Sequence, residues 1–445
     1  MLNLLSDTPK STHRVLKVAV NVPLSREFDY LPAADVPVPA PGSRVLVPFG
    51  SRQQVGLVLG HASESSLSPG KIRRCSHVLD QVPLLSDRDL QLIRFTSDYY
   101  HHPIGEVVAA ALPALLRQGK PLHPVVEMIA ITDPGEDTDI EALAKRAPKQ
   151  AELLETLCDA GGNGLEADHL TDVLPNWRRV ARSLFEKGLI VRLEERGADF
   201  DETLAPEAEP GPDLNKAQQA AVSTLRTGAG FATYLIEGIT GSGKTEVYLH
   251  RMRDIIEQGR QVLVLAPEIG LTPQLVARLR KRLGIEPALL HSGLTDNERL
   301  AAWRAARSGA ARLVVGTRSA IFTPLANPGL IIVDEEHDHS FKQQEGLRYS
   351  ARDLAIVRAK QLDVPVVLGT ATPTLEVLQH CRDGNYKHIH LPSRAGGAKP
   401  PTMRLIDTMR TPASDGLSEP LVDAIRRHLE ADGQVLIFLN RRGFA

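Results

Sequence analysis

Residues 238–245 have the pattern G-x-x-x-x-G-K-T, which combines residue types and a spacing suited to binding phosphate. The run follows an apolar stretch at 232–236 and precedes a helix-compatible segment, which is the strand, turn and helix start of a phosphate site. Glycines let backbone N–H groups approach phosphate oxygens, Lys244 can reach the β- and γ-phosphates, and the Thr245 hydroxyl can bind Mg²⁺. The sequence therefore predicts a nucleoside triphosphate site, formed by Gly238, Ile239, Thr240, Gly241, Ser242, Gly243, Lys244 and Thr245.

An acidic segment further along argues against a chance match of that pattern. The sequence Asp-Glu-Glu-His at 334–337 directly follows the apolar run 330–333. A carboxylate at the end of a buried strand is where P-loop enzymes place a second Mg²⁺ ligand, and Asp334 has this position. Glu335 is then placed to orient or deprotonate the attacking water. Taken alone the segment could be a charged strand exit, but its position downstream of Lys244 favours a nucleotide-hydrolysing site.

Several other loops are expected at the same edge of a sheet. Segments 266–272 and 315–319 each lie at a strand end, and strand ends in an open parallel sheet face one rim, which gives Thr317 and Arg318 as DNA-contacting candidates. Residues 271–320 hold nine basic side chains against three acidic ones, in a chain whose formal net charge is −2. This local surplus suits a phosphodiester backbone. The alternative is solvated helix faces, which the spacing favours for Arg304 and Arg307.

The segment 341–349 mixes aromatic and cationic side chains, which is the chemistry of base stacking and phosphate contact on a mobile loop. Its candidate DNA-contacting residues are Phe341, Lys342, Arg348 and Tyr349. Thr370 and Thr372 end the next strand, and their hydroxyls could bridge the nucleotide and nucleic-acid sites. Alternatively, they could cap a helix that starts at Pro373, and the two roles are compatible. Together these segments predict an ATPase motor that nucleic acid stimulates.

The elements that position these residues predict an α/β multidomain chain. Residues 1–105 read as a small β-rich domain, because short apolar runs alternate with turn signals. Residues 106–195 read as mostly helical and end in a basic amphipathic helix, a glycine stop and a strand. That order is typical of a winged-helix-like domain, and an ordinary helical bundle end is equally compatible with it. The proline-bearing acidic segment 196–213 reads as a flexible linker.

The region 214–393 has the pattern of a parallel sheet covered by helices on both faces, a P-loop lobe. Its expected strands are 232–237, 261–266, 287–290, 312–316, 329–333 and 365–369. A second linker at 394–411 precedes 412–445, with a helix at 420–429 and a strand at 434–439. Because such a pair cannot bury its own apolar face, we expect a truncated start of another lobe and a chain that is a fragment.

The cysteines Cys75, Cys158 and Cys381 are far apart and predict neither a zinc site nor a disulfide framework, which suits a reducing cytosol. The start of the chain lacks the charge and the apolar core of a signal peptide, and no apolar run approaches ~18 residues. We therefore expect a cytoplasmic protein without a membrane partner.

Many of these segments resemble the family of bacterial replication-restart helicases PriA (primosomal protein N′). The likeness rests on G-I-T-G-S-G-K-T, A-P-E-I-G-L-T-P-Q, L-H-S-G-L, G-T-R-S-A-I-F, D-E-E-H-D, K-Q-Q-E-G-x-R-Y, G-T-A-T-P and N-R-R-G-F, with F-D-Y-L, V-P-F-G and Y-Y-H-H-P-I-G-E-V near the N-terminus. It extends over essentially the whole chain, and the K-Q-Q-E-G-x-R-Y and N-R-R-G-F segments are specific to this family.

The resemblance implies a nucleoid-associated superfamily 2 helicase with a RecA-like lobe, using ATP and Mg²⁺ to move 3′-to-5′ on DNA. It implies recognition of stalled or abandoned forks, D-loops and single-stranded DNA, and assembly with other primosome proteins, single-stranded-DNA-binding protein and a replicative helicase loader. Phe28, Asp29, Gly50 and Lys71 would line a pocket for the 3′ end of the nascent strand. By the same likeness, Gln218 would read adenine and His337 would couple hydrolysis to DNA movement.

Departures from the family pattern are mild at Ser350 and Thr370, but the family's eight zinc-binding cysteines and second lobe with its arginine finger are absent. We therefore expect no zinc by that route, and binding of ATP·Mg²⁺ and forked DNA with little or no hydrolysis and unwinding. Two alternatives stay open. One is a fork-binding assembly module without motor activity, and the other is a helicase-like translocase subunit of a restriction enzyme.

Overall fold

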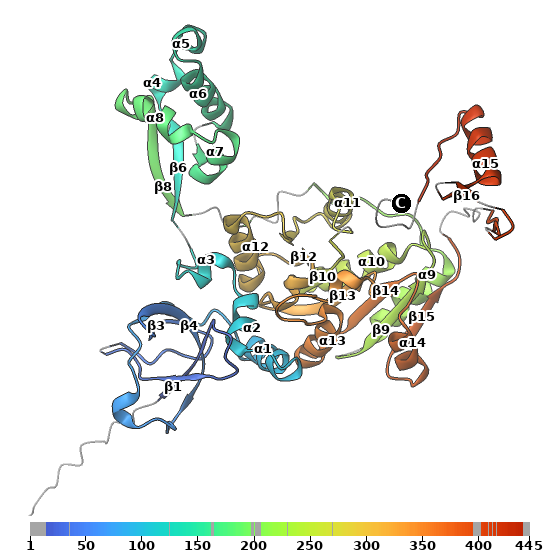
Figure 1. Ribbon diagram of the computed structural model, residues 1–445, viewed down its shortest axis with the longest axis horizontal. Coiled ribbons are helices and arrows are strands. Elements are labelled where there is room, and N and C mark those ends of the chain that lie inside the picture. Colours follow the sequence, from blue (N-terminus) through green and yellow to red (C-terminus); the bar gives the residue numbers. More distant parts are fainter. Residues whose placement is uncertain are drawn as a thin grey trace, which may run out of the picture. The chain divides into compact units, whose positions relative to one another are not determined.

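The structure is a computed structural model whose described residues are 15–34, 36–123, 125–161, 164–196, 200, 206–228, 230–268, 270–394, 402–407, 409–411, 413–414 and 416–438. The chain divides into two compact units, Met1–Ala395 and Gly396–Ala445 (Figure 1). In the described ranges, every helix is too short or too polar to cross a membrane.

The first unit begins with an antiparallel sheet of five strands in the order β2-β1-β4-β3-β5. The strands are β1 (Val15–Val20), β2 (Phe28–Tyr30), β3 (Arg44–Phe49), β4 (Arg52–Ala62) and β5 (His77–Val78), and a short 3₁₀ helix, η1 (Pro69–Lys71), precedes β5. Alternate side chains of each strand point to opposite faces. Val18 and Val58 fill a small core on one face, and Ala19 and Leu57 point to the other face, toward the following helices.

Those helices are α1 (Asp87–Tyr99), α2 (Ile104–Ala111) and α3 (Ala114–Arg117). Helix α1 was not predicted, although its start carries a readable signal: Ser86 and Asp89 form a reciprocal capping box. Apolar side chains of α1 and α2, such as Ile93 and Val107, belong to the same core as the parallel sheet described below. The two helices thus connect the antiparallel sheet to that lobe through one continuous core.

The next region is helical with a three-stranded antiparallel sheet in the order β7-β6-β8. Its elements are β6 (Val125–Ile131), α4 (Asp133–Glu136), α5 (Ile140–Arg146), α6 (Pro148–Ala160), β7 (Leu165–Glu166), α7 (Ala167–Val173), α8 (Trp177–Glu186) and β8 (Ile190–Arg196). The expected basic helix is α8, and Gly188 ends it with a φ of 67°. The succession of helix, turn, helix and paired strand is the winged-helix order, and it favours that alternative over a simple bundle.

The parallel sheet has seven strands in the order β11-β12-β10-β13-β14-β9-β15. They are β9 (Thr233–Gly238), β10 (Gln261–Leu265), β11 (Ala288–Leu290), β12 (Leu313–Gly316), β13 (Pro328–Asp334), β14 (Val366–Thr370) and β15 (Lys387–Leu391). All six expected strands are present, and β15 is an additional edge strand. The predicted α/β architecture, with a β-rich N-terminal domain, a helical region and a RecA-like lobe, is confirmed.

Helices cover both faces of this sheet (Figure 1). They are α9 (Lys216–Thr227), α10 (Lys244–Glu257), α11 (Pro273–Leu283), α12 (Asp296–Ser308), α13 (Ala351–Leu362) and α14 (Leu375–Arg382), with the 3₁₀ helices η3 (Arg318–Phe322) and η4 (His339–Phe341). In β10, Val262 and Val264 pack toward α9, α10 and α11, and Leu263 and Leu265 point to the opposite core, which holds α12 and α13. Burial on both faces explains why these strands read as continuous apolar runs.

The second unit contains a short hairpin, β16 (Ala413–Ser414) and β17 (Leu417–Ser418), followed by α15 (Glu419–Glu430). The helix expected at 420–429 is present. The strand expected at 434–439 is wrong over its described residues 434–438, which pair with no other described strand. Leu436 and Phe438 are exposed there, because no described element of this unit covers them. The segment N-R-R-G-F at 440–444 lies outside the described residues.

Candidate nucleotide and nucleic-acid site

The strand order places the predicted functional loops at one edge of the sheet, in two groups. The loops after β9, β13 and β14, which are adjacent strands, carry the glycine-rich run, Asp334 and Thr370. The loops after β10, β12 and β11, on the other half of the sheet, carry Glu268, Arg318 and His291. Ligands of open α/β sheets bind outside the carboxyl ends of the strands. The edge therefore offers two neighbouring sites, the first built around the glycine-rich run.

The glycine-rich run has the backbone shape that its sequence predicts. Gly241 and Gly243 have φ values of 82° and 85°, in the left-handed region that favours glycine, and α10 begins directly afterwards at Lys244. Gly238 is also required, since a Cβ there would overlap the Ser242 hydroxyl. The turn and the amino end of α10 present backbone N–H groups to the same space, which is the geometry of an anion site.

Lys244 and the acidic segment converge at this turn. The buried Lys244 amine donates a hydrogen bond to the carbonyl oxygen of Gly238 at 3.0 Å and lies 3.8 Å from the Glu335 carboxylate. The positive charge of Lys244 also acts to lower the pKa of the neighbouring Asp334. The side chains of Lys244, Asp334 and Glu335 thus face one another across the ends of β9 and β13.

Asp334 is held by a residue that sequence reasoning missed. The Tyr248 hydroxyl, on α10, donates to Asp334 Oδ1 at 3.3 Å. A Cβ at Gly369 would overlap that hydroxyl, so only glycine fits opposite it on β14. Burial, and after it the negative charge of Glu335, raises the pKa of Asp334 to about 6. Tyr248 follows Lys244 by one helical turn, and that spacing was the available signal.

The raised pKa of Asp334 predicts a pH dependence of stability in metal-free buffer. Its ordinary pKa is 3.8, so between that value and about 6 the unfolded chain ionises and the native carboxyl stays protonated. The free energy of unfolding should therefore fall by up to about 3 kcal/mol as the pH rises through this window. Urea unfolding with EDTA from pH 4 to 7 measures it. The free energy of unfolding of the wild type should fall relative to that of Asp334→Asn across the window. A relative stability that stays constant contradicts the expectation.

The rest of the acidic segment is shaped by a strained backbone and a buried carboxylate. Glu335 has a φ of 49°, an uncommon conformation for a residue with a Cβ. Glu336 is buried and accepts hydrogen bonds from the Thr374 backbone N–H at 2.9 Å and from Arg352 at 3.1 Å. These contacts, which sequence reasoning also missed, fix the segment against the loop after β14 and turn Glu335 toward Lys244.

His337 contacts the threonine that ends β14. Its Nδ1 lies 2.6 Å from the Thr370 hydroxyl, and the backbone N–H of Thr372 donates to the same hydroxyl at 3.1 Å. The imidazole also lies 3.6 Å from the Glu335 carboxylate. His337 is therefore a second side chain, beside Glu336, that joins the acidic segment to the loop after β14.

Gln218 lies beside the glycine-rich run, and both groups of its amide have partners. Its Nε2 donates to the Ser242 carbonyl oxygen at 2.9 Å, and its Oε1 accepts from the Asn215 backbone N–H at 2.9 Å. The side chain is buried. Gln218 is thus placed next to the phosphate turn, and reading a base edge would require it to exchange one of these hydrogen bonds.

The residues at the turn fit a triphosphate with Mg²⁺. The buried Ser242 hydroxyl has no hydrogen-bond partner among the described residues, and the half-buried Thr245 hydroxyl likewise has none in this part of the chain. A hydroxyl and a carboxylate are ligands that Mg²⁺ prefers. Thr245 and Asp334 are therefore the residues that would hold the ion, and Lys244 with the turn's N–H groups would hold the phosphates.

The second half of the edge is organised around Arg318. Its guanidinium donates to the Ser340 carbonyl oxygen at 3.0 Å, and the backbone N–H of Thr317 donates to Leu290 at 3.0 Å. Ser292 donates to the Glu268 carboxylate, which ties the loops after β11 and β10 together. Arg318 connects this half to the segment that follows the acidic residues, and so to the nucleotide side.

Much of the basic surplus in 271–320 stabilises the fold. Arg282 is buried and pairs with Glu246 at 2.6 Å, and Arg278 pairs with the same carboxylate. The expectation that Arg304 and Arg307 lie on solvated helix faces is wrong. Arg304 is buried, and Arg307 donates to the Leu84 carbonyl oxygen at 2.8 Å. The reason is tertiary: α12 packs against the segment before α1, which its own sequence does not reveal.

The segment 341–349 also differs from its prediction. Phe341 and Tyr349 are each 2% exposed and belong to the core, which contradicts the expectation that their rings stack on bases. Tyr349 packs edge-to-face on Phe322 at 5.1 Å. Lys342 and Arg348 are exposed, and the Lys342 amine donates to the Arg348 carbonyl oxygen at 2.7 Å. The two cationic side chains, Lys342 and Arg348, are therefore accessible to a ligand. The two aromatic side chains are not.

The expected 3′-end pocket lies in the antiparallel sheet. Asp29 accepts from the Lys17 amine at 2.7 Å and from the Ser65 hydroxyl at 2.5 Å, and its side chain is 7% exposed. Phe28 packs edge-to-face on Phe49, which directly precedes Gly50 at the β3–β4 turn.

The remaining two residues of that pocket lie on neighbouring segments. Gly50 has a φ of 60°, and a side chain there would meet nothing within 4 Å. Its carbonyl oxygen accepts from Arg73 at 3.2 Å, and Lys71 lies two residues earlier at the end of η1. The segments that carry the four predicted residues therefore meet at one end of the sheet, where a carboxylate with spare lone pairs can accept a further hydrogen bond.

Two protein-family models match the chain. One, described as a 3′ DNA-binding domain of PriA, matches residues 17–113. The other, described as a DEAD/DEAH box helicase, matches residues 215–380. The first covers the antiparallel sheet with α1 and α2, and the second covers most of the parallel sheet with both groups of loops.

Three curated proteins named replication restart protein PriA are similar to nearly the whole chain. The protein of Haemophilus influenzae is 40% identical over 97% of this chain, that of Chlamydia pneumoniae is 33% identical over 98%, and that of Bacillus subtilis is 32% identical over 95%. These matches cover 59%, 59% and 61% of the respective relatives. The chain thus spans about three-fifths of the length of these relatives.

Proposed function

Because this chain belongs to the replication restart protein PriA family, we propose that it acts as an ATP-dependent 3′-to-5′ DNA helicase at stalled or abandoned forks and D-loops. In this role it promotes primosome assembly, with single-stranded-DNA-binding protein, a replicative helicase loader and other primosome proteins as partners. The observation that carries the proposal is the shared sheet edge, where the phosphate turn and acidic segment occupy one half and the loops of Thr317 and Arg318 the other. The family assignment sets aside the restriction-enzyme translocase.

Each charged residue of the nucleotide half has a role that its position supports. Lys244 stabilises negative charge on the phosphates, and Thr245 with Asp334 holds Mg²⁺, which supplies further charge neutralisation when bound. Glu335, turned toward Lys244, accepts a proton from the attacking water. His337, through Thr370, couples the acidic segment to the loop after β14, and Arg318, through the Ser340 carbonyl, connects the segment after the acidic residues to the DNA half.

A fork-dependent ATPase and unwinding assay tests the proposal. The helicase proposal predicts that the chain releases phosphate from ATP faster with forked DNA than without it and separates a labelled duplex when the loading strand permits 3′-to-5′ movement. The sequence led us to expect little or no hydrolysis and unwinding, so the assay decides between the two. ATP and fork binding without DNA-stimulated hydrolysis would instead support the alternative, a fork-DNA-binding module with little or no unwinding. Failure to bind forked DNA contradicts both functions.

The Asp29 pocket predicts a preference for a free 3′ hydroxyl. Its carboxylate can accept a hydrogen bond from that hydroxyl but repels a 3′ phosphate. The wild type should bind an oligonucleotide with a 3′ hydroxyl about tenfold more tightly than the same oligonucleotide with a 3′ phosphate, the value of one hydrogen bond to a charged group. Asp29→Ala should remove this preference, as fluorescence anisotropy measures.

The matched control is Asp98→Ala, which removes an exposed carboxylate from α1 in the same domain. It should retain the tenfold preference. If Asp29→Ala discriminates between the two ends as well as the control does, Asp29 does not read the 3′ terminus.

A further inference from the structure

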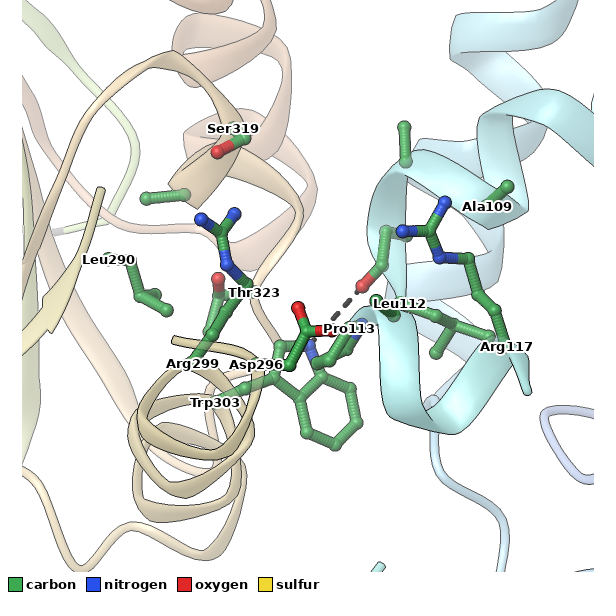
Figure 2. A pocket seen from close by; sticks show the side chains of 14 residues that line it. Ala109, Leu112, Pro113, Arg117, Leu290, Asp296, Arg299, Trp303, Ser319 and Thr323 are labelled. Atoms are coloured by element: carbon green, nitrogen blue, oxygen red, sulfur yellow. Dashed lines mark hydrogen bonds between the residues drawn. The ribbon is translucent and has the colours of Figure 1, made fainter. Parts of the chain in front are cut away.

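A cavity of about 240 Å³ lies between helices α2 and α3 on one side and α12 with η3 on the other (Figure 2). It opens at the carboxyl ends of β11 and β12, where Leu290 and Ser319 line it. This is the half of the sheet edge away from the glycine-rich run, because β10, β13 and β14 lie between these strands and β9. The cavity is thus separate from the nucleotide site and belongs to the other group of loops.

Two arginines face each other across this cavity. Figure 2 shows Arg117 on one wall and Arg299 on the other, with Asp296 between them. Arg117 is exposed, and its guanidinium makes no hydrogen bond or ion pair within the described part of the chain. Arg299 uses one nitrogen to donate to the His291 carbonyl oxygen at 2.8 Å, which leaves its other N–H groups available. Two guanidinium groups against one carboxylate leave the cavity with net positive charge.

The two walls are fixed to each other. The Trp303 indole on α12 donates to the Ala111 carbonyl oxygen at the end of α2, at 3.2 Å (Figure 2). Arg307, one turn later on α12, donates to the carbonyl oxygens of Leu84 and Pro83 at 2.8 and 2.6 Å. The spacing between the helices that carry Arg117 and Arg299 is therefore set before a ligand arrives, so binding between the two walls does not have to order them.

The remaining lining identifies the chemistry of the ligand. Small side chains from α2 and α3, including Ala110 and Ala114, leave room between the walls, and Ser319 adds a hydroxyl. The aromatic residue of the lining, Trp303, is 3% exposed, so the described lining offers no open ring on which a base could stack. Guanidinium and hydroxyl groups without a stacking surface match a sugar-phosphate backbone and carry no sequence information.

We propose that this cavity binds a phosphodiester group of a single DNA strand, clamped between Arg117 and Arg299 with Ser319 as a further donor. The inference rests on the proposed function, since it places the strand on the DNA half of the sheet edge. It adds a contact in which the segment after the antiparallel sheet and the helicase lobe hold the same strand. Asp296 weakens this contact by charge repulsion.

Fluorescence anisotropy with a labelled oligothymidylate whose 3′ end is blocked by phosphate tests the site in the full chain. Arg117→Gln and Arg299→Gln should each weaken binding about tenfold, the value of a charge-assisted hydrogen bond. Each should also reduce the slope of log affinity against log salt concentration by about 0.7, the value for one phosphate of a single strand. Asp296→Asn should strengthen binding.

Two further variants separate a built site from general electrostatic attraction. Ala110→Trp fills the mouth of the cavity without changing charge and should weaken binding as much as Arg117→Gln does. Arg382→Gln removes an exposed arginine at the end of α14 and should change neither affinity nor slope. Equal losses for Arg382→Gln and Arg117→Gln, or full affinity for Ala110→Trp, overturn the proposal.

The outcomes also distinguish this site from the proposed function. If the wild type binds the oligothymidylate and Arg117→Gln keeps its affinity and slope, the cavity proposal fails and the helicase proposal stands. If the wild type binds neither this strand nor forked DNA, the proposed function fails and the cavity proposal fails with it.

Discussion

Replacing Lys244 by alanine should lower DNA-stimulated ATP hydrolysis by a factor of about 10²–10³, the usual effect of removing one donor that stabilises developing charge. The amine lies between the Gly238 carbonyl oxygen and the Glu335 carboxylate, so the substitution leaves a negative charge facing the phosphates without its counter-charge. Steady-state phosphate release with and without forked DNA measures the effect, and ATP binding should weaken in parallel.

A lysine that is exposed on the same lobe provides the control for this experiment. Lys360 lies in the last turn of α13, and Lys360→Ala should leave hydrolysis unchanged. Fork binding by Lys244→Ala should also stay within a factor of two of the wild type, because the DNA half of the edge is intact. Hydrolysis by Lys244→Ala at the wild-type rate would show that the phosphates lie elsewhere.

Arg44→Met should destabilise the antiparallel sheet by about 3–5 kcal/mol, the cost of breaking a buried ion pair by removing one partner. Arg44 is fully buried and donates to both oxygens of Asp80, at 2.7 and 2.9 Å, and to the carbonyl oxygens of Leu116 and Lys120. It therefore ties β3 to the end of α3, next to Arg117. Hydrogen exchange of β3 and β4 in rising urea reports the local free energy of opening.

Two variants make this stability prediction specific. Arg52→Met removes an exposed arginine from β4 of the same sheet and should change the free energy by less than about 0.5 kcal/mol. The double variant Arg44→Met/Asp80→Leu replaces both charges with apolar groups and should recover part of the loss. The recovery is partial because the Arg44 backbone N–H and the Leu116 and Lys120 carbonyl oxygens still lose these partners. A single Arg44→Met variant as stable as Arg52→Met would mean that the pair contributes nothing to the sheet.

The strands of the parallel sheet could be predicted because burial on both faces gives continuous apolar runs. The edge strand β15 could not, because only Ile389 and Leu391 of its five residues are buried and histidines alternate with them. Its place beside β9 depends on pairing with a strand about 150 residues away in the sequence. The capping box at the start of helix α1 is a local signal for a helix. The short apolar runs and turn signals of the surrounding region 1–105 led to a β-rich prediction instead.

The nucleotide half of the edge could be predicted because its chemistry is local. A glycine-rich turn, a lysine and a carboxylate at a strand end can each be recognised within a few residues. Tyr248 contacts Asp334 only once β13 and α10 are packed together, and the burial of Phe341 and Tyr349 depends on helices from another part of the chain. Residue type therefore predicted which side chains could do chemistry, and tertiary packing decided which of them are accessible.

The central claim is that Lys244 and Asp334 act on one Mg²⁺-bound triphosphate, and a double-mutant cycle tests it most directly. ATP affinity in the presence of Mg²⁺ is measured by calorimetry for the wild type, Lys244→Ala, Asp334→Asn and the double variant. Residues that share a ligand at this range should couple by about 0.5–3 kcal/mol, so the double variant should lose clearly less or more than the sum of the single losses. Additive losses, within about 0.3 kcal/mol, would contradict a shared site.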